Sequence, residues 1–295
     1  MKIAIIEPIG IASEEIRAAL SGHTITECDS RQWSDEQLIR FVKEVDIITL
    51  TNRRLSRAVI DAATQLKLIA VAFSGIDHVD LDAAKKRDIP VKNAAGYAST
   101  AVSELVVGLM ISLARNIPEN DRKIRQGAAT NTGTELKGKV LGIVGFGAIG
   151  SEVARLAQAF RMTTLVYDRK NSLTLEDLFS RSDFVTLHVP LSDVTRGMVD
   201  LRLLSKMKRT AYLINCARGP IVKSYDLRQA LEQGLIAGAA LDVFDVEPPL
   251  PADDPLFEVP HLIATPHIGF NTREALRAKG ELTLKNIKEF LQTSH

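Results

Sequence analysis

The chain has 295 residues, of which 45% are apolar and 25% are charged, and its formal net charge is +1. This length allows one large domain or two ordinary ones, and we expect two. Because the sequence contains no block of like charge, nucleic acid and anionic membrane surfaces are not expected as partners.

Short apolar, β-rich runs alternate with helical patterns along the whole chain, which is typical of parallel sheets built from βαβ units. We expect two such sheets. The first has predicted strands at 2–6, 46–50, 68–72 and 91–92, with helices at 13–20, 34–42 and 56–65. The second has predicted strands at 140–144, 164–167, 184–188, 211–215, 237–241 and 262–265. Six strands with intervening helices match a dinucleotide-binding sheet.

A long helical pattern lies between the two sheets, from about Thr100 to Arg115 and on to about Gln126. It is apolar on most faces, so we expect it to be buried between domains or between subunits. A homodimer formed through residues 100–126 is therefore a candidate assembly. Small polar residues at 127–133 predict a surface loop, and a final helix is expected over 273–291.

The first strand of the second sheet leads into a glycine-rich turn, Gly-Phe-Gly-Ala-Ile-Gly, and then into a helical pattern. Gly145 permits a tight turn, Gly147 lets the backbone approach a pyrophosphate, and Gly150 lets helix and strand pack closely. The first helical turn then presents its N–H groups to the phosphates. Asp168 ends the next strand and can bind ribose hydroxyls while repelling a 2′-phosphate, which favours NAD over NADP. Arg169 could reach a phosphate and keeps NADP open.

Ligands of open α/β sheets bind beyond the carboxyl ends of the strands, and three chemically capable side chains follow strands of the second sheet. Arg218 suits a substrate carboxylate and carbonyl oxygen, because its guanidinium is always charged and planar. His267 can donate and accept a proton near neutral pH. Glu247 could hold and tune that imidazole. Each residue alone could be a solvated surface group; together they predict hydride exchange between a nicotinamide cofactor and a 2-keto acid.

Other candidate residues favour structural roles. His188 precedes Pro190 and is expected to line the cofactor cleft without taking part in chemistry. Asp77, Asp80 and Asp82 resemble the start of a helix, where acids suit the dipole, so no metal site is expected. Cys28 and Cys216 are far apart without metal-ligand spacing, which indicates reduced thiols and a cytoplasmic location. Neither a cleavable signal nor a membrane-spanning run is expected.

Five segments of the chain, 141–150, 188–190, 214–219, 240–248 and 265–269, resemble those of the NAD-dependent D-isomer-specific 2-hydroxyacid dehydrogenases. The resemblance covers nearly the whole length. It implies a Rossmann-type doubly wound parallel sheet inserted in a discontinuous flavodoxin-like α/β substrate domain. The substrate domain would be 1–95 plus 272–295, and the NAD-binding domain 96–271. The implied reaction is reduction of a small 2-keto acid to a D-2-hydroxy acid.

The resemblance also implies residue roles, with Arg218, Glu247 and His267 as the catalytic set. Ala148 and Ile149 would contact the pyrophosphate, Cys216, Ala217 and Asp242 the nicotinamide side, and residues 73–76 the substrate carboxylate through backbone N–H groups. The full set of implied cofactor contacts is Gly145, Gly147, Ala148, Ile149, Gly150, Asp168, His188, Pro190, Cys216, Ala217, Arg218, Asp242, His267 and Gly269. The implied substrate contacts are Ser74, Gly75, Ile76, Arg218 and His267.

Two segments are shorter than is usual in that family. The first, 167–182, predicts that a strand beside the adenine pocket is absent; the second, 126–137, lacks the usual tryptophan. No regulatory domain is expected after the last helix.

Two questions stay open at the level of sequence. One is whether the chain is an active enzyme or an NAD(H)-sensing binding protein of the same fold, as in the corepressor relatives; the intact catalytic set favours the enzyme. The other is the substrate, for which glyoxylate, hydroxypyruvate, pyruvate and 3-phosphoglycerate are all reasonable. Arg53, Arg54 and Arg57 could reach a phosphorylated substrate or could be solvated charges.

Overall fold

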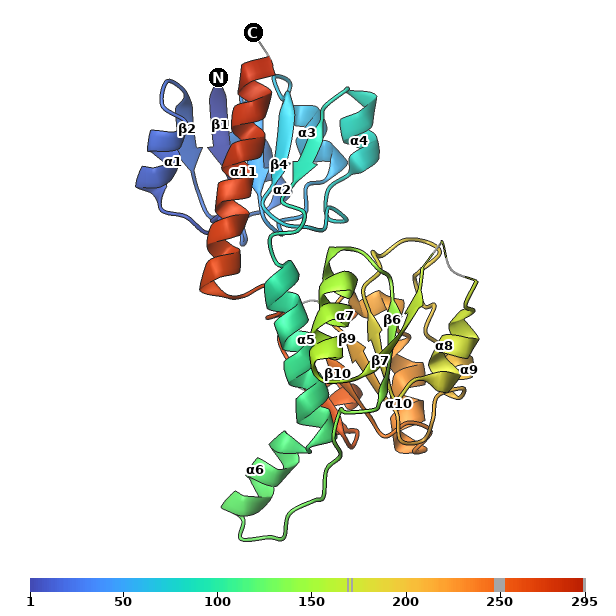
Figure 1. Cartoon of the computed structure of the whole chain (residues 1–295). Coiled ribbons are helices and arrows are strands. Elements are labelled where there is room, and N and C mark those ends of the chain that lie inside the picture. Colours follow the sequence, from blue (N-terminus) through green and yellow to red (C-terminus); the bar gives the residue numbers. More distant parts are fainter. Residues whose placement is uncertain (169, 171, 247–252, 294–295) are drawn as a thin grey trace. The chain divides into compact units, whose positions relative to one another are not determined.

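The computed structural model describes residues 1–168, 170, 172–246 and 253–293. The chain forms two compact units, which we call unit 1 (Met1–Ala98 with Thr272–His295) and unit 2 (Ser99–Asn271). Each unit contains one parallel sheet flanked by helices (Figure 1). The predicted α/β fold class is therefore confirmed.

Unit 1 has a five-stranded sheet in the order β2-β1-β3-β4-β5, which is the flavodoxin-like order. Its strands are β1 (Lys2–Ile5), β2 (Thr24–Glu27), β3 (Ile47–Leu50), β4 (Leu68–Val71) and β5 (Val91–Asn93). Its helices are α1 (Ser13–Ala19), α2 (Asp35–Val42), α3 (Arg57–Ala62), α4 (Leu81–Lys86) and α11 (Arg273–Thr293). Strand β2 was not predicted, because this edge strand alternates exposed and half-buried residues and has no apolar run.

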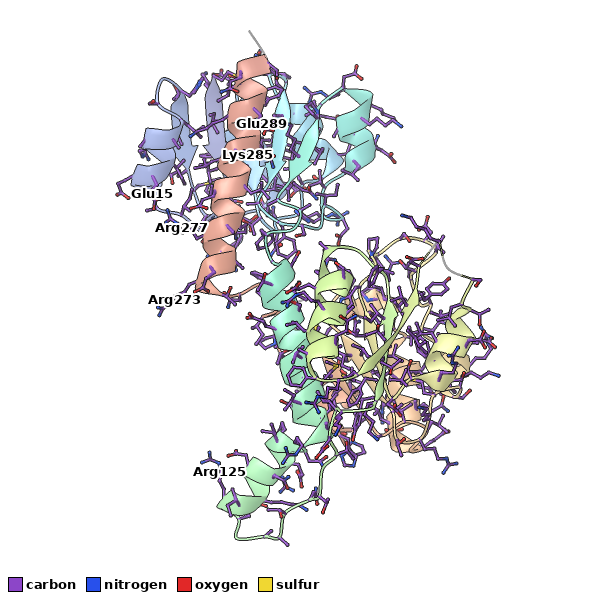
Figure 2. The ribbon with its side chains drawn as sticks, viewed as in Figure 1. Glu15, Arg125, Arg273, Arg277, Lys285 and Glu289 are labelled. Atoms are coloured by element: carbon purple, nitrogen blue, oxygen red, sulfur yellow. The ribbon has the colours of Figure 1, made fainter. Side chains whose placement is uncertain are left out.

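Helix α11 returns the end of the chain to the sheet of unit 1 (Figure 1). Leu284, Ile287 and Leu291 lie on one stripe of the helix and pack in the same core cluster as Ile3 of β1. At its exposed side, Arg277 pairs with Glu15 of α1 at 3.1 Å (Figure 2). Residues from the two ends of the chain thus complete a single hydrophobic core.

Unit 2 has a six-stranded sheet in the order β11-β10-β9-β8-β6-β7. All six strands were predicted: β6 (Val140–Val144), β7 (Thr163–Tyr167), β8 (Phe184–Leu187), β9 (Tyr212–Asn215), β10 (Gly238–Leu241) and β11 (Leu262–Ala264). They alternate with α7 (Ala148–Ala159), α8 (Leu175–Arg181), α9 (Leu201–Leu204), η1 (Gly219–Ile221), α10 (Ser224–Glu232) and η2 (Pro255–Glu258). Because β6 pairs with both β7 and β8, the loops after β6 and β8 lie at the topological switch point, where such sheets bind ligands.

The single long helix expected over 100–126 is in fact two helices, α5 (Ser99–Ala114) and α6 (Ile117–Arg125), at 55° to each other. Asn116 between them has a left-handed φ of 51°, and a proline stands in the first turn of α6, which explains the break. Helix α5 buries residues such as Val106 and Met110, whereas α6 has no buried residue. Within the described ranges, no helix by itself has the length and apolar character to cross a membrane, and only the bent α5–α6 pair reaches that threshold.

Candidate active site

The glycine loop follows β6 directly and requires glycine at two positions, one for its backbone conformation and one for close packing. Gly145 has a φ of +97°, and a Cβ there would lie 2.5 Å from the carbonyl oxygen of His188. A Cβ on Gly150 would lie 2.1 Å from the carbonyl oxygen of Gly145, so α7 packs tightly against the loop. At Gly147, by contrast, a Cβ would meet no atom within 4 Å. The backbone at Gly147 is therefore open to the close approach of a ligand.

Helix α7 begins at Ala148, and no side chain caps its amino terminus at Gly147. The first N–H groups of an α-helix have no partner within the helix, and the dipole there favours negative charge. Ala148 and Ile149 lie in this first turn. The loop and the helix end therefore fit the pyrophosphate of a dinucleotide.

Asp168 follows β7, at the same sheet edge as the glycine loop, since β7 pairs with β6 and the amide of Gly145 donates to the carbonyl of Tyr167 at 2.9 Å. The half-buried Asp168 accepts a hydrogen bond from the backbone N–H of Lys170 at 2.8 Å. Arg169, the residue that kept NADP open, lies outside the described residues. In the described part of the chain, β7 is the edge of the sheet, as the short segment after Asp168 predicts.

Asp242 organises the turn after β11. Its buried carboxylate accepts hydrogen bonds from the Thr265 hydroxyl at 2.6 Å and from the N–H groups of Ile268 and Gly269 at 2.8 and 2.7 Å. Its backbone carbonyl accepts from the N–H of His267 at 2.9 Å. The family resemblance placed Asp242 only on the nicotinamide side. The structure gives this carboxylate a further role, because it binds the Thr265 hydroxyl before His267 and two backbone N–H groups after it.

His267 stands in this turn with a left-handed φ of 53°, a conformation that costs free energy in a residue other than glycine. Its ring is half-buried and meets Phe270 edge to face, with centroids 5.4 Å apart. The bonds to Asp242 compensate for the cost of this backbone conformation. The imidazole is thereby fixed at the carboxyl end of β11.

Asn215 organises the turn after β9 in a similar way. Its side chain is fully buried, donates to the Arg218 carbonyl at 2.9 Å and accepts from the Ala217 N–H at 3.0 Å. A Cβ on Gly219 would lie 2.0 Å from the carbonyl oxygen of Phe244, so this turn packs directly on the chain that follows β10. This role of Asn215 was not predicted from the sequence.

Arg218 lies in this turn with a half-buried side chain, and its guanidinium donates to the Ala217 carbonyl at 2.7 Å. The pKa of the Cys216 thiol is raised well above its usual value by burial and by the charge of Asp242, so the thiol stays protonated near neutral pH. Because β9, β10 and β11 are neighbours and parallel, Arg218, Asp242 and His267 share one sheet edge. Glu247, the third predicted catalytic residue, lies outside the described residues.

His188 has the contacts of a structural residue. Its N–H donates to the Val144 carbonyl at 2.7 Å, and its ring Nε2 lies 3.0 Å from the hydroxyl oxygen of the buried Thr186. The ring is partly accessible, but neighbouring atoms exclude enough water to lower its pKa to about 4. The imidazole is therefore neutral at physiological pH. Pro190, two residues on, is exposed, and its carbonyl accepts from the Thr195 hydroxyl at 2.7 Å.

The predicted substrate segment, Ser74–Ile76, belongs to unit 1 and follows β4. Ser74 is exposed, and its carbonyl accepts from the Asn93 side chain at 2.7 Å. Gly75 and Ile76 are half-buried. The nearby acids behave as predicted at a helix start, since Asp80 caps α4 by accepting from the Ala83 N–H.

The three arginines after β3 have different environments. Arg53 donates to the Trp33 carbonyl and to Asp35 and is half-buried, which is a structural role. Arg57 lies 3.6 Å from Asp80. Arg54 is exposed and lines a cavity of about 330 Å³ beside residues 77–80. Arg57 is exposed and lines the same cavity, but Asp80 is close to its guanidinium, so Arg54 is the better candidate to meet an anionic ligand.

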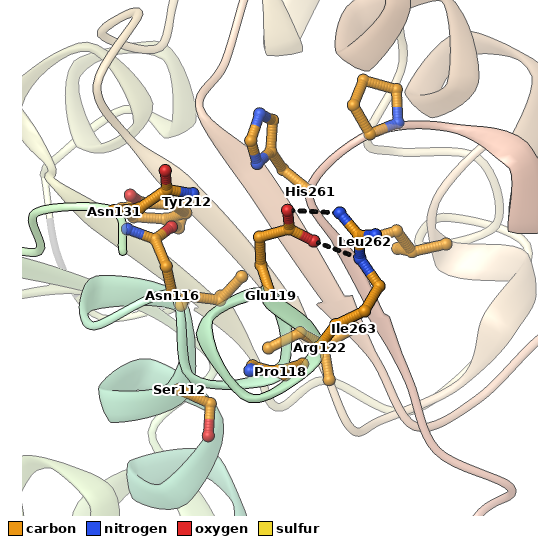
Figure 3. Close-up of a pocket in the computed structure, with 12 residues that line it drawn as sticks. Ser112, Asn116, Pro118, Glu119, Arg122, Asn131, Tyr212, His261, Leu262 and Ile263 are labelled. Carbon is orange, nitrogen blue, oxygen red and sulfur yellow. Dashed lines mark hydrogen bonds and ion pairs between the residues drawn. The ribbon is translucent and has the colours of Figure 1, made fainter. Parts of the chain in front are cut away.

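A further pocket, of about 410 Å³, lies in unit 2 at the start of β9 and β11 (Figure 3). Tyr212, His261 and the paired Glu119 and Arg122 line it. These strand ends are opposite to those that bear Arg218 and His267. None of the predicted site residues lines this pocket, so it is not the candidate active site.

Comparison with known proteins gives a consistent result. The family model of the D-isomer specific 2-hydroxyacid dehydrogenase NAD-binding domain matches residues 107–269. The chain is 39% identical over 281 residues to the glyoxylate reductase of Thermofilum pendens, covering 88% of this chain and 83% of that one. It is 38% identical over 273 residues to the D-3-phosphoglycerate dehydrogenase of Methanocaldococcus jannaschii, covering 87% of this chain and 52% of that one. The chain belongs to the D-isomer specific 2-hydroxyacid dehydrogenases.

A solved structure supports the same assignment to the D-isomer specific 2-hydroxyacid dehydrogenases. The D-lactate dehydrogenase of Aquifex aeolicus, complexed with NAD and lactic acid, matches with a TM-score of 0.87 at 27% identity, over 99% of this chain and 96% of that one. The predicted family, enzyme class and NAD cofactor are thereby confirmed. The chain spans about half the length of the Methanocaldococcus enzyme.

Proposed function

We propose that this dehydrogenase reversibly reduces a small 2-keto acid to the D-2-hydroxy acid. One observation carries the proposal. The adjacent strands β9, β10 and β11 end in turns that bring Arg218 and His267 to one sheet edge, and the buried Asn215 and Asp242 hold those turns. Fixed donors at the carboxyl edge of such a sheet are what carbonyl reduction needs.

When bound, NADH supplies a hydride to the carbonyl carbon. Arg218 binds the substrate carboxylate and carbonyl oxygen, and its positive charge favours the electron density that develops on that oxygen. His267 donates the proton that completes the hydroxyl group, and it takes the proton back in the oxidative direction. From the sequence we assign to Glu247 the tuning of that imidazole, and to the backbone N–H groups of Ser74–Ile76 a part in binding the substrate carboxylate.

A panel assay tests this function. NADH absorbance is followed with glyoxylate, hydroxypyruvate, pyruvate and 3-phosphohydroxypyruvate, the keto form of 3-phosphoglycerate, and we expect turnover of at least one. Measurable NADH binding without turnover of any of them would instead support the NAD(H)-sensing alternative. The values of kcat/KM across the panel identify the substrate, and a preference for the phosphorylated acid would assign Arg54 to its phosphate.

We propose NAD rather than NADP as the physiological cofactor because Asp168 follows β7 at the sheet edge of the glycine loop, where a carboxylate would repel a 2′-phosphate. Asp168→Ala should bring the Kd values for NADH and NADPH closer together in a fluorescence titration. Unchanged relative affinities would count against this role.

The enzyme is further proposed to be a homodimer that works in the cytoplasm. Ile117 and Ile124 of α6 are 47% and 66% exposed, and apolar side chains at this density on one helix indicate a protein contact. A second copy of the chain joined through residues 100–126 would cover them. The two cysteines, both free in the structure, are consistent with a reducing compartment.

A further inference from the structure

Glu7 is a buried carboxylate in unit 1 that the proposed mechanism does not use. It follows β1, its residue is 3% exposed, and one of its oxygens accepts three backbone hydrogen bonds. The donors are the N–H groups of Thr51, Asn52 and Arg53, at 2.7, 2.8 and 2.8 Å. Charge-assisted bonds of this kind are about twice as strong as neutral ones. Glu7 therefore fixes the loop that follows β3.

Two cations from other parts of unit 1 are within the electrostatic range of Glu7. Lys279 of α11 is 4% exposed; burial lowers its pKa, and the charge of Glu7 opposes that shift. The pKa of Arg31 is raised mainly by Asp29, and the charge of Glu7 adds to that shift. A Cβ on Gly10 would lie 2.2 Å from the carbonyl oxygen of Leu276. The segment that follows Glu7 thus packs on α11, while the carboxylate of Glu7 binds the loop after β3.

The loop that Glu7 holds lies at the edge of the sheet where the substrate segment begins. Strand β3 pairs with β4, so Thr51 lies beside the chain that leads to Ser74–Ile76. The next residue after the three donors is the exposed Arg54, which lines the 330 Å³ cavity. Leu55 then bridges to Val79. The conformation of residues 51–54 therefore determines where the Arg54 side chain and the neighbouring backbone groups lie relative to a ligand at this edge of the sheet.

We propose that Glu7 is a positioning residue, which holds the Thr51–Arg54 loop in the conformation that binds the substrate. The proposal rests on the proposed function, because it assumes that the substrate is a 2-keto acid and that the sheet edge of residues 51–54 takes part in binding it. Glu7 does not touch the reacting atoms. Its loss should weaken substrate binding, while the chemistry at His267 and the affinity for NADH in unit 2 stay unchanged.

Two variants of Glu7 and one matched control test the proposal. Glu7→Gln keeps the volume and an acceptor oxygen but removes the charge, whereas Glu7→Asp keeps the charge. Asp46→Asn is the control, because Asp46 also accepts a backbone N–H, that of Lys2 at 2.8 Å, but at the opposite edge of the same sheet. We expect Glu7→Gln to raise KM for the keto acid about tenfold, with kcat and the NADH Kd within about threefold of wild type. The KM of Glu7→Asp should lie closer to the wild-type value than the KM of Glu7→Gln, and Asp46→Asn should leave KM unchanged.

Hydrogen exchange gives a readout that does not depend on turnover. The amides of Thr51, Asn52 and Arg53 should exchange about tenfold faster in Glu7→Gln and at the wild-type rate in Asp46→Asn. If these amides exchange in Glu7→Gln at the wild-type rate, the proposal for Glu7 is wrong, whether or not the wild type is active. If the wild type reduces no keto acid, that result contradicts only the proposed function. An unchanged KM in an active Glu7→Gln enzyme, or an equal rise of KM in Asp46→Asn, also overturns the proposal for Glu7.

Discussion

At the scale of single residues, buried polar groups decide where the candidate catalytic side chains stand. Asn215 and Asp242 each bond two backbone groups of a turn, and the candidate side chains in these turns are Arg218 and His267. Losing one such acceptor leaves buried N–H groups without partners, at about 1–3 kcal/mol each. The geometry of the site therefore depends on residues that do not react.

We expect His267→Ala to lower kcat by about 10²–10⁴, because the variant cannot donate a proton in the transition state. Steady-state assays with the preferred keto acid measure this. His261→Ala is the matched control, since His261 also has a left-handed φ, of 58°, but stands at the start of β11. The acid–base assignment fails if His267→Ala keeps more than about a tenth of the wild-type rate, or if the two variants lose the same amount.

His188 should make the stability of the protein depend on pH. Its pKa is about 4 in the folded chain against 6.5 as its ordinary value, so the unfolded chain binds the proton more tightly. The contribution of neutral His188 to the free energy of unfolding is fully present above pH 6.5, and it is lost as the pH falls through 4. In thermal melts recorded between pH 6.5 and pH 4, the Tm of His188→Gln should fall less with decreasing pH than the Tm of the wild type. If the Tm of His188→Gln depends on pH as steeply as the Tm of the wild type, the assignment is wrong.

The sequence suggests candidate roles where the chemistry of a side chain alone points to them. Arg218 and His267 stand out because few side chains bind a carboxylate or transfer a proton near neutral pH. Asn215 and Glu7 were missed because their value depends on the backbone groups they meet, which sequence does not show. A buried polar residue at the last position of an apolar strand is a signal that could have found Asn215.

At the scale of elements, the sequence located the buried parts of the fold better than its edges. The four inner strands of unit 2, β6, β8, β9 and β10, were predicted because their apolar runs reflect burial on both faces. The edge strands β7 and β11 are only half-buried but keep short apolar runs. Strand β2 was missed because it is half exposed. The break between α5 and α6 was missed because both sides keep a helical pattern, while Asn116 and Pro118 bend the chain.

The glycine loop allows a test that separates folding from cofactor binding. Gly147→Ala adds a Cβ that meets nothing within 4 Å, so the free energy of unfolding should change by less than about 1 kcal/mol. The methyl group stands where the pyrophosphate must approach, so the Kd for NADH should rise about tenfold or more. Calorimetry and fluorescence titration measure the two effects.

Gly150→Ala provides the comparison for that test. Its Cβ would overlap the carbonyl oxygen of Gly145 at 2.1 Å, so we expect a lower Tm as well as weaker NADH binding. A Gly147→Ala variant that binds NADH as wild type does would show that the cofactor does not approach the loop there.

At the scale of the whole molecule, the exposed apolar residues of α6 predict a homodimer, whose mass can be measured in solution. We expect the wild type to have twice the mass of one chain in light scattering, and Ile124→Glu to shift it toward the mass of one chain, because a charge in an apolar contact is costly. Val194→Glu is the control, since Val194 is 87% exposed but lies in the loop after β8. A wild-type protein with the mass of one chain contradicts the proposed dimer.

The path of the chain through unit 1 also constrains its synthesis on the ribosome. Strands β1 to β5 emerge early, but Leu284, Ile287 and Leu291, which complete their core, emerge last. Between β5 and α11 lie about 180 residues, which take roughly 9–36 s to translate at 5–20 residues per second. During that interval unit 2 can fold completely, while the part of the first sheet that α11 covers remains exposed. The amino-terminal part of the nascent chain is therefore the part that needs protection from aggregation for the longest time.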